Sequence, residues 1–127
     1  RQEVKEMLQP LLPQLLPSAS SCSPADLCEL VHCLAVAQLP DHALLSTISP
    51  LLLDRLPHLG PQKLAVLTAD LARLRHVRDQ RGTFTQVLGA LHQRLGTTGQ
   101  LDALSVCHVV CAIARVGVGR RLYEPMP

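Results

Sequence analysis

Aromatic residues are almost absent from this chain of 127 residues. It contains one Phe, one Tyr and no Trp, although 47% of its residues are hydrophobic. A core made of Leu, Ala and Val suits close-packed helices better than a β-sheet, in which aromatic and β-branched residues are favoured. The apolar fraction also excludes a disordered segment. We therefore expect an all-α fold.

Long hydrophobic runs, a strong net charge and a regular cysteine pattern are also missing. Pro, Asp or Arg interrupts every apolar run before it reaches the length of a bilayer span, so we expect no membrane span. The net charge of +2 permits a nucleic acid partner without requiring one. The five irregularly spaced Cys residues favour a reducing compartment over a secreted disulfide framework. Because the chain has no initiator Met and no signal-like start, we expect a processed protein or a piece of a longer one.

Motifs of enzymes and metal sites are absent as well. The Ser, His and Asp residues form no nucleophile elbow, and residues 96–99 lack the lysine and the preceding strand of a phosphate-binding loop. Two Cys and His groups lack the short-loop spacing of a structural zinc site. They are Cys28, His32 and Cys33, and Cys107, His108 and Cys111. We expect no catalytic residue, no metal, no cofactor and no small-molecule substrate.

What the chain does contain is an internal repeat. Residues 23–39 and 60–76 each begin with a small residue and a Pro, and Leu follows the Pro at the third, sixth and tenth positions. The corresponding residues, 37 apart, are Leu27, Leu30 and Leu34, and Leu64, Leu67 and Leu71. A helical unit repeated at this spacing is typical of a solenoid.

Apolar periodicity predicts six helices along the chain. We expect them over residues 3–16, 24–39, 42–56, 61–75, 83–95 and 101–116. Pro10 and Pro13 are expected to kink or divide the first helix, and residues 17–21 to form a loop. Ser23 is expected to cap the second helix, and Gly117 and Gly119 to end the last.

These helices alternate between two types, which we call A and B. The B helices contain the aligned segments 11–17, 51–57 and 90–96, offset by 40 and 39 residues. We expect a single helical-repeat segment in a longer array. It comprises a partial repeat 1–21, repeats 23–60 and 61–99, and a partial repeat 100–127. Neither end resembles a polar capping helix, so more chain or a partner protein should cover the exposed apolar faces.

The alignment makes two local predictions. Pro10, Pro50 and Gly89 share one position in the B helices, which predicts a bend or break in each, or a helix that begins late. In the third A helix, Leu104, Cys107, Cys111 and Ala112 correspond to Leu64, Leu67, Leu71 and Ala72 at an offset of 40. The two cysteines are therefore predicted to be buried core residues. Cys28 aligns with Ala65 and Ser105, a position of small residues.

Arginine residues gather near the ends of the A helices. Gln38, Arg75 and Arg115 fall at one repeat position, so stacked repeats would align these cations in a stripe suited to phosphates. The candidate RNA phosphate-binding residues are Arg73, Arg75, Arg78, Arg81, Arg115, Arg120 and Arg121. The alternative is that cations at helix C-termini only complement the helix dipole. Phe84 is expected in the core and Tyr123 is the other aromatic residue, so the chain has almost no ring on which a base could stack. RNA would therefore be bound through its backbone and shape.

The Pro-x-x-Leu start and the cores Leu34-Ala35-Val36-Ala37 and Leu71-Ala72-Arg73-Leu74 resemble octotricopeptide-type repeats. Similar repeats occur in organellar proteins of the FAST-kinase-like and RAP-domain group. HEAT-like and pentatricopeptide-like arrays are alternatives, although the offsets exceed the usual pentatricopeptide length. The resemblance implies a right-handed solenoid of antiparallel helix pairs in the mitochondrial matrix, with the plastid as the alternative.

The partners implied by the resemblance are RNA, chiefly ribosomal RNA, and neighbouring proteins of a large assembly. We therefore expect a non-enzymatic structural component of the mitochondrial ribosome. The alternative is a scaffold subunit of another mitochondrial assembly, such as a respiratory complex or ATP synthase.

Overall fold

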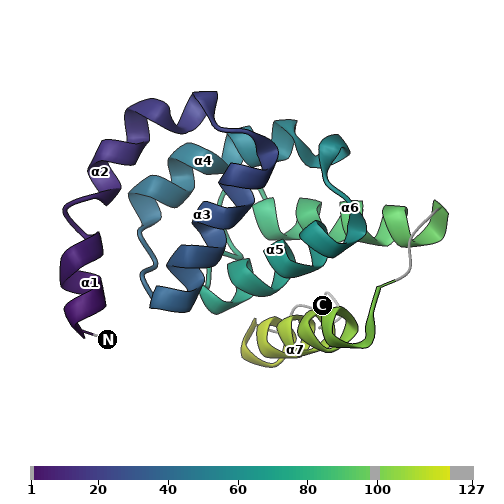
Figure 1. The fold of residues 1–127 in the computed structure, drawn as a ribbon. Coiled ribbons are helices and arrows are strands. Elements are labelled where there is room, and N and C mark those ends of the chain that lie inside the picture. The colour runs from purple at the N-terminus through teal and green to yellow at the C-terminus, as the bar shows by residue number, and fades with distance from the viewer. Residues whose placement is uncertain (1, 98–100, 121–127) are drawn as a thin grey trace.

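The computed structural model describes residues 2–97 and 101–120, and every regular element among them is helical (Figure 1). The α-helices are α1 (Gln2–Leu8), α2 (Leu12–Leu15), α3 (Pro24–Ala37), α4 (His42–Asp54), α5 (Pro61–Arg73), α6 (Thr83–Thr97) and α7 (Ala103–Arg120). Two short 3-10 helices are η1 (Leu16–Ser21) and η2 (Leu56–His58). The expected all-α fold is confirmed for these residues.

The helix predicted at the N-terminus is divided. α1 ends at Leu8 and α2 begins at Leu12, so the break falls at Pro10, which has no backbone N–H to continue the helical hydrogen bonds. The predicted loop over residues 17–21 is instead part of η1, which follows α2 directly.

At the two equivalent positions the prediction of a break is wrong. α4 runs through Pro50 and α6 runs through Gly89, and both helices begin well before these residues. Helix α4 buries Leu45, Ile48 and Leu52 on one face, and this packing offsets the hydrogen bond that Pro50 does not donate. The alternative of a late helix start is therefore also wrong for α4 and α6.

Helices α3 and α5 end in the same way. Gln38 and Arg75, which follow them at an offset of 37 residues, have positive φ angles of 57° and 58°. In each case the N–H of this residue donates to a carbonyl three residues back (3.1 Å), and the next N–H donates to one five residues back (2.9 Å). This is the Schellman type of helix ending. The prediction that Ser23 caps α3 is confirmed, because Ser23 Oγ accepts a hydrogen bond from the backbone N–H of Asp26 (3.1 Å).

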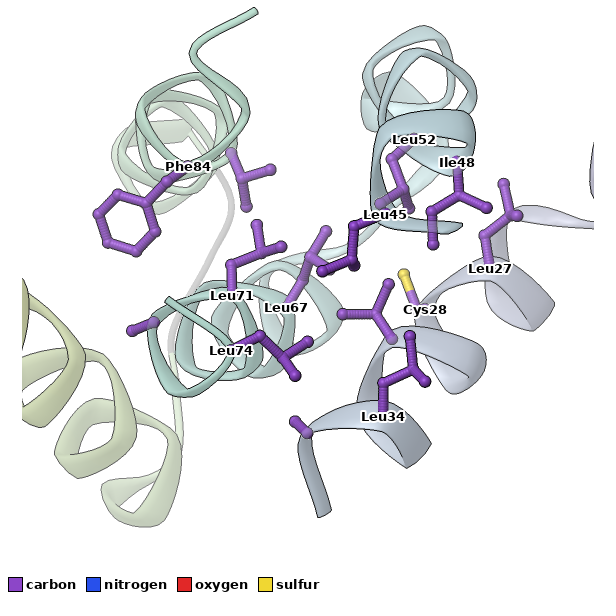
Figure 2. Close-up of a cluster of buried hydrophobic side chains, with 14 of the residues drawn as sticks. Leu27, Cys28, Leu34, Leu45, Ile48, Leu52, Leu67, Leu71, Leu74 and Phe84 are labelled. Atoms are coloured by element: carbon purple, nitrogen blue, oxygen red, sulfur yellow. The ribbon is translucent and has the colours of Figure 1, made fainter. Parts of the chain in front are cut away.

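Helix α5 lies at the centre of the molecule. It packs against α3 on one side and α7 on another, and α6 covers a third (Figure 1). Figure 2 shows leucines of α3, α4 and α5 converging in one core, with the buried sulfur of Cys28 among them. Phe84 of α6 is buried in the same core, as predicted. No helix in the described part of the chain is long and apolar enough to cross a membrane.

Two arginines that share one position in the predicted alignment donate hydrogen bonds to earlier parts of the chain. Arg55 at the end of α4 donates to the carbonyl of Ser20 in η1 (3.3 Å), 35 residues earlier. Arg94 in α6 donates to the carbonyl of Leu59, also 35 residues earlier (2.5 Å). Arg94 further donates to the carbonyls of Leu56 (3.2 Å) and Pro57 (2.7 Å). Helix α6 is therefore held to the preceding connection by three such hydrogen bonds, and the end of α4 by one.

Helix α7 does not follow the predicted register. It turns Ser105, Ala112 and Val116 inward, whereas Cys107 and Cys111 are exposed, so the prediction that these cysteines are core residues is wrong. The small side chains of Ser105 and Ala112 let α7 approach α5 closely, and Ser105 Oγ donates to Gln62 Oε1 (2.6 Å). The helix is apolar nearly all round, so periodicity does not determine its buried face. It also continues beyond Gly117 and Gly119 to Arg120.

Candidate functional site

Charge is distributed unevenly along the chain. Residues 73–127 contain eight of the twelve Lys and Arg residues but only three of the ten Asp and Glu residues. Helices α6 and α7 contain no acidic residue at all. The basic end of the molecule is therefore formed by the C-terminus of α5, the connection that follows it, α6 and α7.

A small crevice between α5 and α7 brings two of the predicted arginines together. Arg73 of α5 and Arg115 of α7 line it with His108. The other lining residues are Ala69, Cys111 and Ala112. Its volume is about 40 Å³, close to the space of one or two waters. Both arginine side chains are exposed and His108 is half-buried. Two guanidinium groups beside one imidazole provide donors for a phosphate group on the surface.

Asp70 lies beneath this basic surface and is 2% exposed. His32 of α3 contacts both of its carboxylate oxygens through Nδ1, at 3.0 and 3.2 Å. Burial raises the pKa of Asp70 above its usual value, although His32, Arg73 and His108 oppose that rise. The buried carboxylate thus links α3 to α5 and lies near the cations of the crevice.

The other predicted phosphate-binding residues lie outside the crevice. Arg75, Arg78 and Arg81 are exposed along the connection between α5 and α6. Arg115 lies inside α7, so it does not share the helix-ending position of Gln38 and Arg75. The side chain of Arg120 and the whole of Arg121 lie outside the described residues, as does Tyr123.

A buried Ser–His–Asp group connects α4 to the α5–α6 connection, and its geometry is not that of a catalytic triad. His76 Nε2 lies 3.2 Å from Ser49 Oγ and 3.7 Å from Asp79 Oδ2, so one ring nitrogen faces both groups. In a triad the two partners face different ring nitrogens. Ser49 Oγ also donates to the carbonyl of Leu45 (2.6 Å), and Ser49 is fully buried. The group therefore joins α4 to the α5–α6 connection.

Each member of the group is held in place by burial or by hydrogen bonds. Burial lowers the pKa of His76, and His42 lowers it further while Asp79 opposes the shift. Burial alone would raise the pKa of Asp79, but hydrogen bonds from the hydroxyl and backbone N–H of Thr83 hold it below the usual value. Asp79 thereby fixes the start of α6.

Family models, curated proteins and solved structures gave no match to this chain. The case for a function therefore depends on the chain's own residues. Within residues 2–97 and 101–120, no group of three or more His, Cys, Asp or Glu residues is arranged to hold a metal ion. All five cysteines are free thiols.

An apolar groove lies between α6 and α7, away from the crevice. Its volume is about 490 Å³. Its lining includes Leu88, Gly89, His92 and Leu95 of α6, and Val109 and Ile113 of α7. A Cβ atom added at Gly89 would meet no atom within 4 Å, so the groove is open next to this glycine.

Sequence reasoning missed the groove, His108 and the role of Asp70. The groove was hidden because the alignment placed the wrong face of α7 inward. His108 was considered only as a zinc ligand, although its position seven residues, or about two helical turns, before Arg115 places it on the same helix face as that arginine. Asp70 interrupts the apolar pattern of α5, and this polar residue at a buried position was the available signal.

Proposed function

We propose that this chain is a non-enzymatic helical-repeat segment that binds RNA through phosphate contacts on its α5–α7 surface. In this proposal the helices form a right-handed solenoid of antiparallel pairs, and α3, α5 and α7 form one layer of it. Two observations support the repeat. Helices α3 and α5 end in the same backbone conformation, and Arg55 and Arg94 each donate a hydrogen bond to a carbonyl 35 residues earlier.

The observation that carries the RNA proposal is the meeting of Arg73, His108 and Arg115 at one crevice. Arg73 lies on α5, 35 residues before His108 and 42 residues before Arg115 of α7. Helices α6 and α7 contain no acidic residue. Arginine binds phosphate oxygens in a bidentate manner, and a surface with few carboxylates does not repel a polyanion. Arg75, Arg78 and Arg81 extend the basic surface beyond the crevice.

The resemblance to octotricopeptide-type repeats supports an organelle as the location, with ribosomal RNA of the mitochondrion as the proposed partner. In that setting the chain would be a structural component of the ribosome. The scarcity of aromatic side chains supports recognition of backbone and shape, because base stacking needs exposed rings.

The proposal is tested by comparing two double variants on one unstructured single-stranded RNA. Arg73→Gln with Arg115→Gln removes both crevice arginines, whereas Lys5→Gln with Lys63→Gln removes the same charge from elsewhere. We expect the first variant to bind about tenfold more weakly and the second to bind almost as well as the natural chain. Equal affinities of the two variants would refute the crevice as the binding site.

A second candidate function is that of a protein–protein scaffold in a mitochondrial assembly. The apolar groove between α6 and α7 and the exposed apolar residues of α7 favour it, because such surfaces mark protein interfaces more often than nucleic acid sites.

A further inference from the structure

Two of the five cysteines form an exposed pair on α7. Cys107 and Cys111 are free thiols, and both are exposed. The repeat alignment predicted them to be buried, where a thiol packs as a small apolar side chain. Because α7 instead turns Ser105 and Ala112 inward, both thiols are accessible to a ligand in solution.

The two thiols lie on the same face of the helix. Four residues turn an α-helix through about 400°, so Cys107 and Cys111 are about 40° apart around its axis, with their Cβ atoms about 5–6 Å apart. A metal ion in line between two thiolates separates the sulfurs by about 4.6 Å, which is twice a metal–sulfur bond of about 2.3 Å. The pair can therefore bind one ion without a change in the backbone.

The other Cys and His group of the sequence does not offer this arrangement. Cys28 and Cys33 are five residues apart on α3, so they are about 140° apart around its axis. Cys33 is exposed, but Cys28 is buried, and burial raises its pKa to about 11. Since the thiolate is the form that binds a metal, Cys28 is a poor ligand.

The number of ligands restricts the metal. A structural zinc ion takes four ligands, and in the parts of the chain that the structure describes no three His, Cys, Asp or Glu residues are grouped to hold a metal. Two thiolates without a third ligand suit a soft ion of low coordination number. Cu(I) is the ion of this kind that thiolates select.

Cations lie beside the pair. When Cu(I) binds, two S–H bonds break, two copper–sulfur bonds form and both protons pass to water, so the complex has a net charge of −1. Arg115 continues the row of Cys107 and Cys111 after another four residues, and Arg73 lines the same crevice as Cys111. Both guanidinium groups are close enough to stabilise an anionic complex.

The carboxylates of this region do not face the pair. Asp102 is exposed and accepts a hydrogen bond from the backbone N–H of Ser105 (2.8 Å), which caps the start of α7. It precedes Cys107 by five residues, so it lies about 140° away around the helix. Asp70 is buried against His32 of α3.

We propose that Cys107 and Cys111 form a two-coordinate bis-thiolate site for Cu(I) on the surface of α7. The proposal goes beyond RNA binding and does not depend on it, because the metal binds to the sulfurs and not to the arginines.

The test compares two double variants by competition with a chromophoric Cu(I) chelator under argon. Cys107→Ser with Cys111→Ser removes the proposed site, whereas Cys22→Ser with Cys33→Ser removes two other thiols that are not buried. We expect the first variant to bind Cu(I) at least about a hundredfold more weakly, because it lacks the chelating pair, and the second to bind as the natural chain does. An equal loss of affinity in both variants, or a loss in neither, would overturn the proposal.

A third variant tests the spacing while the number of thiols stays the same. Val106→Cys with Cys107→Ser places the two thiols of α7 five residues apart, and Val106 is 45% exposed, so the fold should be retained, as circular dichroism would show. We expect the affinity for Cu(I) to fall about a hundredfold. Unchanged affinity would refute the role of the four-residue spacing.

X-ray absorption at the copper edge measures the ligand set directly. In the natural chain with one equivalent of Cu(I) we expect two sulfur neighbours. Three or more neighbours, or nitrogen and oxygen neighbours in place of sulfur, would contradict the two-coordinate site.

Discussion

Replacing Arg94 tests whether its hydrogen bonds from α6 to the connection between α4 and α5 stabilise the fold. The guanidinium of Arg94 donates to three carbonyls, of Leu56, Pro57 and Leu59, at 3.2, 2.7 and 2.5 Å. A hydrogen bond to a charged group contributes about 1.5–3 kcal/mol when well buried, and Arg94 is only half-buried, so we take about 1 kcal/mol for each bond. We therefore expect Arg94→Ala to lower the free energy of unfolding by about 3 kcal/mol.

Two further variants separate the geometry of the side chain from its charge. Arg94→Lys keeps the charge, but a single ammonium group does not span three carbonyls, so we expect a loss of about 2 kcal/mol. Arg55→Ala removes one long-range bond of 3.3 Å and should cost about 1 kcal/mol. The assay is urea unfolding followed by helical circular dichroism, with the exposed Arg81→Ala as the control. An unfolding free energy of Arg94→Lys equal to that of the natural chain would refute this reasoning.

Three other predictions concern the backbone, the buried histidine and the thiols. Gln38→Gly should stabilise the protein by about 1 kcal/mol in urea unfolding because Gln38 has a positive φ, whereas Gln80→Gly should not. Because burial lowers the pKa of His76, the unfolded chain binds a proton at this histidine more readily than the folded chain does as the pH falls below about 6.5. The free energy of unfolding should therefore fall by at most about 1.4 kcal/mol per pH unit, and by less in His76→Gln. Burial raises the pKa of Cys28 to about 11, so iodoacetamide at pH 8 should leave it unmodified after Cys107 and Cys111 have reacted, as mass spectrometry would show.

The sequence predicted the helical class and most helix boundaries because its signals are local. Pro24 and Pro61 mark the starts of α3 and α5, and the leucine spacing identifies the faces that they bury. The equivalence of Gln38 and Arg75 was also visible in the alignment, and their shared backbone conformation agrees with it.

The predictions failed where local signals compete with packing or are ambiguous. Pro50 is a poor interior helix residue, but the buried face of α4 outweighs its effect on the backbone. In α7 nearly every position is apolar or small, so the pattern allows several buried faces, and the contact of Ser105 with Gln62, 43 residues earlier, determines the one observed. A contact at that separation cannot be derived from periodicity.

The candidate site was predicted only in part for the same reason. Arg73 and Arg115 were identified as phosphate-binding residues, and the structure brings them to one crevice. Their neighbour His108 joins them only through the packing of α7 on α5. The buried Asp70 precedes Arg73 by three residues on α5, and its contact with His32 depends on the packing of α3. The stripe expected from Gln38, Arg75 and Arg115 depended on a shared helix ending that α7 does not have at Arg115.

The salt dependence of RNA affinity tests the proposed function most directly. The logarithm of the association constant for a single-stranded RNA should fall linearly with the logarithm of the salt concentration, by about 0.7 for each phosphate contacted. Removing Arg73 and Arg115 together should make this slope shallower by about 1.4, while removing Lys5 and Lys63 should leave it unchanged. A slope that is the same in the natural chain and in the Arg73→Gln, Arg115→Gln variant would contradict phosphate binding at this surface.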